Sequence, residues 1–337
     1  LRELFTLEDI TPQVREYLYT MLESNLGVMK EVLSRADTPD IDTGKHCARP
    51  YRCPFFSYCR QDFPLYSIEE LPGARVELLD DLKLHGIRDI AKIDSGFPKL
   101  TSLQSRVRES VISGNPYVGP KISEVISGME YPFMHMDFET FMPALPHYPG
   151  THPYQVIPFQ WSIHIQKENG VIEHQEFLFE GYDDPREAFL STLIDAAGDT
   201  GSIVTYSNYE DTQLKKLAEQ FPEYADDIES VINRFWDLEN LFQDYKDPRF
   251  LGKTTLKTVL PTLEPNMSYD GLKIDEGNLA GVKWEEMIMS DDEDLKNNIK
   301  RDLLDYCYQD TFGMVQLYQH IIAEIPAPGN EQVEILW

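Results

Sequence analysis

The spacing of apolar residues changes along the chain, and the change separates a helical first part from a second part that mixes strands and helices. Apolar residues recur near helical spacing over residues 8–35, which predicts a helix there. Residues 36–65 lack this spacing and are rich in Asp, Pro, Gly, Cys and aromatic residues, so we expect loops. Residues 67–93 predict a pair of short helices, interrupted at Pro72-Gly73 and Gly86.

From about residue 130 the pattern alternates between the two kinds of element. It predicts strands over 133–139, 156–165, 173–179 and 203–206, and helices over 185–197, 209–219 and 293–324. This order is typical of an α/β fold in which helices flank a mixed β-sheet. We therefore expect such a domain, preceded by a smaller, mostly helical region that contains cysteines.

Composition narrows the class of protein. The chain has 337 residues, of which 42% are hydrophobic and 26% are charged, as in ordinary globular proteins. No apolar run approaches the ~20 residues that span a bilayer, so we expect no membrane segment. With four cysteines and no recognisable signal peptide, we expect a reducing, cytoplasmic location.

The charge is strongly acidic, with 58 Asp and Glu against 30 Lys and Arg and a net charge of -28. Such a chain binds phosphate backbones poorly by charge alone, which argues against a protein that coats nucleic acid nonspecifically. An acidic protein can still process nucleic acid where divalent metal ions neutralise the site and basic residues cluster locally. The same acidity equally motivates a non-catalytic scaffold or protein-binding module.

A first pair of candidate site residues lies in the strand predicted over 133–139. Asp137 and Glu139 are two residues apart, so both side chains leave the same face of the strand. Burying two carboxylates together is costly unless a cation compensates, and a divalent metal ion is the simplest one. Solvated acids at a strand end are an equally consistent interpretation of this pair alone.

Two further groups of acids follow. Tyr306 and Asp310 are four apart and share one face of the last predicted helix, where a carboxylate can bind metal while a phenol orients water. Glu210 and Asp211 begin the helix predicted over 209–219, where acids favour the helix dipole or else face the same site as Asp137. Four acids in this order can hold two metal ions about 4 Å apart.

This ordered set resembles the DEDDy branch of the ribonuclease-H-like 3′→5′ exonucleases. It is more closely similar to an uncharacterised bacterial family that joins such a domain to a RecB-like nuclease module. The resemblance covers roughly residues 125–325 and is carried by residues 131–140, 158–164, 255–261 and 306–311.

The resemblance implies hydrolysis of phosphodiester bonds at the 3′ ends of DNA or RNA with two Mg²⁺ or Mn²⁺ ions. It implies that the metal ligands and the water-positioning phenol are Asp137, Glu139, Glu210, Asp310 and Tyr306. The second-motif acid is Glu210 because Tyr209-Glu210 matches the family's aromatic–acid step, with Asp211 as the alternative. Lys253 and Lys257 flank the start of a helix at Thr255 and are candidates for contacts with the substrate backbone, although plain surface solvation also accounts for them.

The remaining motif is Cys47, Cys53 and Cys59, which are spaced by six residues. It resembles the tail of RecB-like nucleases that carry an iron–sulfur cluster, which implies an upstream nuclease module. His46 could instead complete a Cys3His zinc site, and reduced thiols in a loop are equally consistent.

These inferences divide the chain into three regions. Residues 1–65 are expected to be the Cys-containing tail of the RecB-like module. Residues 66–125 are a helical linker that faintly resembles a helix-hairpin-helix, and residues 126–337 are the exonuclease domain.

Overall fold

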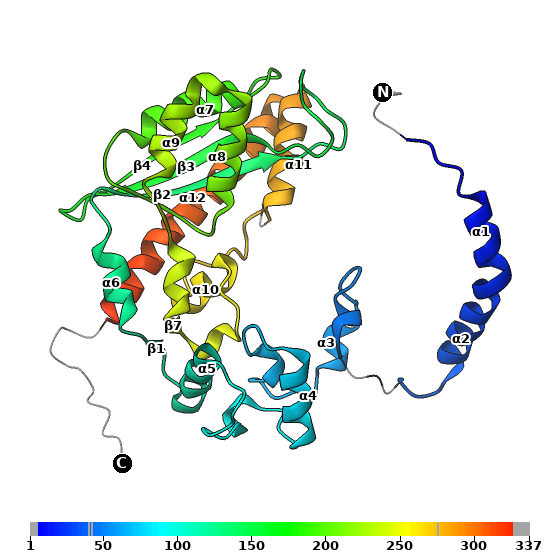
Figure 1. Cartoon of the computed structure of the whole chain (residues 1–337). Helices are drawn as coiled ribbons and strands as arrows, with labels where there is room; N and C mark the ends of the chain where they lie inside the picture. The colour runs from blue at the N-terminus through cyan, green and yellow to red at the C-terminus, as the bar shows by residue number, and fades with distance from the viewer. Residues whose placement is uncertain (1–5, 40, 42, 275, 326–337) are drawn as a thin grey trace, which may run out of the picture. The chain divides into compact units, whose positions relative to one another are not determined.

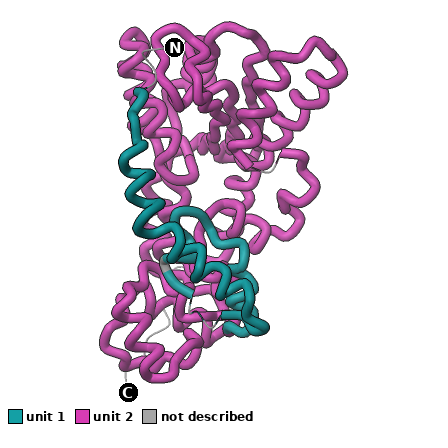
Figure 2. Tube along the Cα trace, turned by 90° about the vertical axis from the view of Figure 1, so that its right-hand side faces the viewer, with its two compact units in different colours: residues 1–63 teal, residues 64–337 magenta. Residues whose placement is uncertain are grey.

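The computed structural model describes residues 6–39, 41, 43–274 and 276–325. The chain forms two compact units, residues 1–63 and residues 64–337 (Figure 2). The boundary falls next to the expected one at residue 65. Residues 66–125, expected as a linker, belong to the same compact unit as the α/β domain. No helix in the described residues is long and apolar enough to cross a membrane.

The first unit consists mainly of one helical run. The helix predicted over residues 8–35 is present as α1 (Thr11–Tyr17), a π-helical turn (Leu18–Leu22) and α2 (Glu23–Ser34). None of the residues in these three elements is buried. The segment expected to be loop contains a short 3-10 turn (Lys45–Cys47) and the single-turn helix α3 (Phe56–Cys59).

The second unit begins with a small helical layer. Its elements are 3-10 turns at Ile68–Glu70 and Ile90–Lys92, α4 (Val76–Leu84), α5 (Ser102–Ser113), β1 (Tyr117–Val118) and α6 (Lys121–Ser127). A separate apolar core holds α4 and α5 together and includes Leu82, Ile90 and Val107. The pattern did not predict α5, although Thr101 and Gln104 form a reciprocal capping box at its start.

A mixed sheet is the centre of the second unit, as predicted, and it contains a fifth strand, β6, that the sequence pattern did not predict. Its spatial order is β4-β3-β2-β5-β6. The strands are β2 (Phe133–Phe141), β3 (Ile157–Gln166), β4 (Ile172–Leu178), β5 (Ser202–Thr205) and β6 (Phe235–Asp237). Strand β3 pairs antiparallel with both β2 and β4, whereas β5 is parallel to β2 and to β6.

Helices cover both faces of this sheet (Figure 1). One layer contains α7 (Arg186–Ala197), α8 (Tyr209–Gln220), a 3-10 turn (Pro222–Tyr224) and α9 (Ala225–Ile232). The other contains α11 (Gly277–Met289) and the long α12 (Glu293–Ala323), and α10 (Leu256–Leu263) packs against α12. Between β6 and α10 the chain forms 3-10 turns at Leu238–Gln243 and Pro248–Phe250, and β7 (Tyr245–Lys246), which pairs with β1.

Side chains along β2 point alternately to the two faces of the sheet, so each face has a different set of residues. Met134, Met136 and Phe138 point to the layer of α7, α8 and α9 and enter an apolar core with it. Phe133 and Phe141 point to the opposite layer and join its core. The residues between these two phenylalanines on that face are polar, so the sheet presents His135, Asp137 and Glu139 toward the side that α12 covers.

Candidate metal centre

Four of the predicted acids come together from three elements of the second unit. Strand β2 supplies Asp137 and Glu139, the first turn of α8 supplies Glu210, and α12 supplies Asp310. Glu139, Glu210 and Asp310 are 4%, 2% and 5% exposed, while Asp137 is partly exposed. Glu210 hydrogen-bonds to Asp137, and the charges of Asp137, Asp310 and Glu210 all act on Glu139. The acids therefore form one buried cluster.

The turn between β5 and α8 directs Glu210 into the cluster. Ser207 has a φ of 75°, in the left-handed region, and its backbone N–H donates to Oδ1 of Asp237 at 2.9 Å. Asp211 lies one position further along α8 and forms an ion pair with Lys215 at 2.8 Å. Of the two acids at this helix start, the structure therefore brings Glu210 to Asp137 and leaves Asp211 with a surface partner.

Burial and crowding make these carboxyl groups hard to ionise. Burial raises the pKa of Asp137 to about 6. Burial, and then the charge of Asp137, raises the pKa of Asp310 to about 8. The same two causes, in the same order, raise the pKa of Glu139 and of Glu210 well above the usual range of glutamic acid. A cation placed among them reverses this effect because it favours the charged form of every acid.

The donor set fits a hard divalent cation such as Mg²⁺ or Mn²⁺. Carboxylate oxygens are the ligands that these ions prefer. Within the described residues, the buried Oε2 of Glu210 has no hydrogen-bond partner, which is costly unless something else binds it. The ligand atoms of Asp137, Glu139 and Cys307 also lie within 4.8 Å of one another.

Cys307 does not extend the set to a soft-metal site. Burial raises the pKa of its thiol, so the group stays protonated. Its Sγ lies 3.8 Å from the backbone oxygen of Asp137, to which it donates a weak hydrogen bond. Cys307 therefore supports β2 against α12 as a neutral thiol.

Two tyrosines surround the carboxylate of Asp310. Tyr306 lies one turn earlier on α12, as the spacing predicts, and hydrogen-bonds to Asp310. Tyr269, in the loop between α10 and α11, donates a hydrogen bond from its hydroxyl to Oδ1 of Asp310. Burial and the charge of Asp310 raise the pKa of both phenols, so both remain neutral donors. Sequence reasoning missed Tyr269 because nothing in the pattern of its segment marks it.

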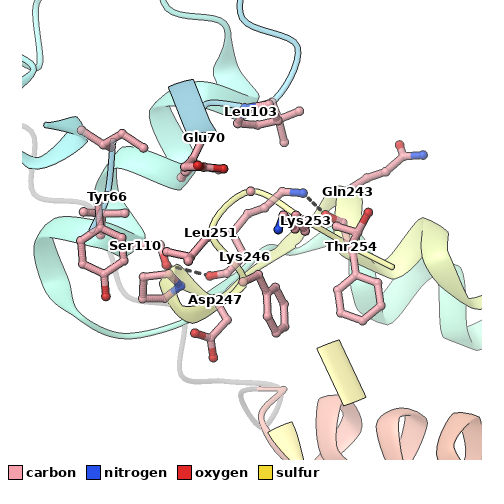
Figure 3. A pocket seen from close by; sticks show the side chains of 18 of the residues that line it. Tyr66, Glu70, Leu103, Ser110, Gln243, Lys246, Asp247, Leu251, Lys253 and Thr254 are labelled. Atoms are coloured by element: carbon pink, nitrogen blue, oxygen red, sulfur yellow. Dashed lines mark hydrogen bonds between the residues drawn. The ribbon is translucent and has the colours of Figure 1, made fainter. Parts of the chain in front are cut away.

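The two candidate lysines lie in different surroundings. The Nζ atom of Lys257, in the first turn of α10, lies 5.0 Å from the ring centroid of Tyr306 and 5.3 Å from that of Tyr269. Its charge lowers the pKa values of Asp137 and Asp310. Lys253 instead lines a pocket of about 280 Å³ between the small helical layer and residues 237–254 (Figure 3).

That pocket contains none of the four acids. Lys246 also lines it, and burial, followed by the charge of Arg106, lowers the pKa of Lys246 to about 8. Ser110 of α5 donates a hydrogen bond from Oγ to the backbone oxygen of Lys246 at 2.8 Å and so ties the two sides together (Figure 3).

The cysteine motif of the first unit is less compact than the acidic cluster. Cys47 is buried, Cys53 is half-buried, and Cys59 and His46 are exposed. The backbone N–H of Cys53 donates to the backbone oxygen of Cys47 at 2.8 Å. Among the described residues, these three sulfur atoms are not part of a group with ligand atoms within 4.8 Å of one another. The iron–sulfur and zinc readings stay predictions.

Comparison with known proteins adds one match. A family described as a domain of unknown function (DUF2779) matches residues 134–255, which run from β2 to the residue before α10. The matched segment includes Asp137, Glu139 and Glu210, whereas Tyr306 and Asp310 lie beyond it. Neither the curated proteins nor the solved structures contain a match to the chain.

Proposed function

We propose that residues 126–337 form a metal-dependent 3′→5′ exonuclease that hydrolyses single nucleotides from the ends of DNA or RNA. One observation carries this proposal: Asp137, Glu139, Glu210 and Asp310, far apart in the sequence, form a single buried cluster with Tyr306 beside it. Burying four carboxyl groups together costs desolvation free energy, and a bound divalent cation would offset that cost.

The order of elements supports a ribonuclease-H-like fold for this domain. Three antiparallel strands are followed by two parallel ones, and the acids stand on the first strand, on the helix after the fourth strand and on the last helix. This is the arrangement that the sequence resemblance implies. A fold alone does not specify an activity, so the proposal rests on the acids and not on the sheet.

The residues divide the chemistry among them. Asp137, Glu139 and Asp310 would hold the metal, and Glu210 adds an oxygen that otherwise lacks a partner. When bound, divalent ions supply an activated water and neutralise charge on the phosphate. Tyr306, as a neutral phenol fixed beside Asp310, orients the attacking water toward the phosphorus atom. Water forms the new P–O bond, and the bond to the 3′ oxygen of the preceding nucleotide breaks.

The proposal is tested with single-stranded DNA and RNA oligonucleotides labelled at either end. We expect 5′-labelled strands to give a ladder that shortens from the 3′ end, with Mg²⁺ or Mn²⁺ but not with EDTA. Asp137→Ala should abolish the ladder while its circular dichroism spectrum stays that of the wild type. Absence of cleavage of every substrate, together with absence of metal binding, would instead favour a non-catalytic scaffold.

A further inference from the structure

Lys257 is held at the edge of the acidic cluster by the packing of α10 on α12. Lys257 and Leu260 are three residues apart and share one face of α10. A Cβ atom at Gly313 would lie 2.4 Å from Cδ2 of Leu260, so glycine at this position lets the Leu260 side chain pack directly on α12. Gly313 is three residues beyond Asp310 on α12. The helix contact therefore places the base of the Lys257 side chain over the face that carries Asp310.

Two aromatic rings fix the ammonium group itself. Its Nζ atom lies 5.0 Å from the ring centroid of Tyr306 and 5.3 Å from that of Tyr269, both within the range of a cation–π contact. Both tyrosines hydrogen-bond to Asp310. The same two phenols therefore contact the ammonium group and orient Asp310, which places the positive charge beside the acids.

The charge of Lys257 acts on several acids together. It lowers the pKa values of Asp137, Glu139 and Asp310, each of which burial raises. Lys257 therefore offsets part of the repulsion in the cluster. Its side chain is nevertheless exposed, so a change of rotamer can carry the ammonium group away while the stem stays on the protein surface.

We propose that Lys257 is an internal cation that competes with the divalent metal ion for the acidic cluster and contacts the substrate phosphate once the ion is bound. The second half of this proposal rests on the proposed exonuclease function, whereas the competition requires only that the cluster binds a cation. Like charges repel, so an ammonium group beside the ligands weakens metal binding. The same group attracts a phosphodiester, which the acidic surface of the protein otherwise repels.

The opposite effects of Lys257 on metal binding and on substrate binding distinguish a competing cation from a residue with a purely structural role. A residue that only supports the site weakens metal binding when it is removed. A competing cation does the reverse: its removal strengthens metal binding and lowers turnover. We therefore compare Lys257→Met and Lys257→Arg with Lys283→Met, which removes a partly exposed lysine that pairs with Glu286 on α11.

The experiment titrates each full-length variant with Mn²⁺ by isothermal calorimetry, in the absence of substrate, and measures nucleotide release separately. For Lys257→Met we expect Mn²⁺ binding on the order of tenfold tighter, the scale of one unit charge in a partly solvated site. We also expect a metal-free Tm below that of the wild type and turnover lower on the order of 10²-fold. Lys257→Arg should keep the wild-type affinity, and Lys283→Met should match the wild type in every measurement.

Equal or weaker Mn²⁺ binding by Lys257→Met would overturn the proposal, even if the wild type cleaves nucleic acid. Tighter Mn²⁺ binding by Lys257→Met with no cleavage by any variant would support the competition and contradict the exonuclease function. The two failures are thus distinguished by separate measurements on the same samples.

Discussion

The hydroxyl group of Tyr269 donates a hydrogen bond to Oδ1 of Asp310, a residue 41 positions further along the chain. Tyr306 bonds to the same carboxylate from one helical turn away. Asp310 is therefore oriented by two phenols from different elements before any ligand arrives. A carboxylate fixed in this way loses less conformational entropy when it binds a metal ion.

We expect Tyr269→Phe to keep the fold and to weaken the site. The hydrogen bond from Tyr269 lowers the pKa of Asp310, so its loss raises that pKa further and favours the protonated acid. Mn²⁺ binding should weaken most on the acidic side of neutrality, and stability should fall by about 1 kcal/mol, as for one lost buried hydrogen bond. Calorimetric titrations at several pH values test the first effect, and urea unfolding tests the second. An unchanged pH profile would show that Tyr269 does not control Asp310.

Glu210 and Asp211 give a matched pair of variants at one helix start. Glu210→Gln removes the charge that faces Asp137, and we expect activity to fall on the order of 10²-fold or more with weaker Mn²⁺ binding. Its metal-free Tm should rise or stay constant because repulsion within the cluster is relieved. Asp211→Asn removes only the ion pair with Lys215. It should leave activity unchanged and the free energy of unfolding within about 0.5 kcal/mol of the wild type. The reverse ranking in a nuclease assay would assign the site to Asp211.

The raised pKa values predict how the metal-free protein responds to pH. The folded protein holds protons on Asp137 up to a pKa of about 6 and on Asp310 up to about 8, against 3.8 for an ordinary aspartic acid. Between these values the folded state binds more protons than the unfolded state, so stability falls as pH rises. These two acids should therefore lower Tm progressively from about pH 4 to about pH 8.

Differential scanning fluorimetry with EDTA measures this decline. Asp310→Asn should make this decline shallower, most clearly between about pH 6 and about pH 8, because its amide does not titrate. Saturating Mn²⁺ should also remove the decline, since the ion stabilises the ionised acids. A metal-free Tm that rises across this range in the wild type and does not change slope in Asp310→Asn would contradict the account of the cluster.

Gly252 lies where the small helical layer contacts the α/β domain, and substitution of Gly252 tests that contact. A Cβ atom at Gly252 would lie 2.0 Å from the backbone oxygen of Glu70, and its φ of 75° already disfavours other residues. We expect Gly252→Ala to destabilise the protein by about 3 kcal/mol, because backbone must move. Gly271→Ala is the control, since Gly271 has a φ of 98° but nothing within 4 Å, and it should cost about 1 kcal/mol. Equal costs in urea unfolding would mean that the close contact with Glu70 is absent in solution.

The sequence predicted strands β2 to β5 and helices α7, α8 and α12, whose apolar spacing is clear, but it did not predict β6 (Phe235–Asp237), α9 (Ala225–Ile232) or α11 (Gly277–Met289). Strand β2 alternates between Met134, Met136 and Phe138 on one face and polar residues on the other, and α12 keeps helical periodicity throughout its length. The same spacing placed Tyr306 and Asp310 on one helical face. Local patterns of this kind need no knowledge of the partner elements.

The rest of the site depends on contacts that local patterns do not encode. Tyr269 lies in a loop without periodicity, and its hydroxyl meets Asp310 across 41 positions of the chain. Lys257 and Lys253 have the same residue type and similar neighbours in the sequence, yet one lies over Tyr306 and the other lines a separate pocket. Such differences arise from tertiary packing, which a single sequence does not display.

The central claim is that the four acids form a divalent cation site, and calorimetric titration with Mn²⁺ tests it most directly. Wild-type protein and Asp137→Asn are titrated at about pH 8, where a larger fraction of the acids is ionised. The account predicts saturable binding by the wild type and loss of this binding in the variant. Binding should release protons, so the measured heat should change with the ionisation enthalpy of the buffer. Saturable Mn²⁺ binding of equal affinity in both proteins, or none in the wild type, would contradict it.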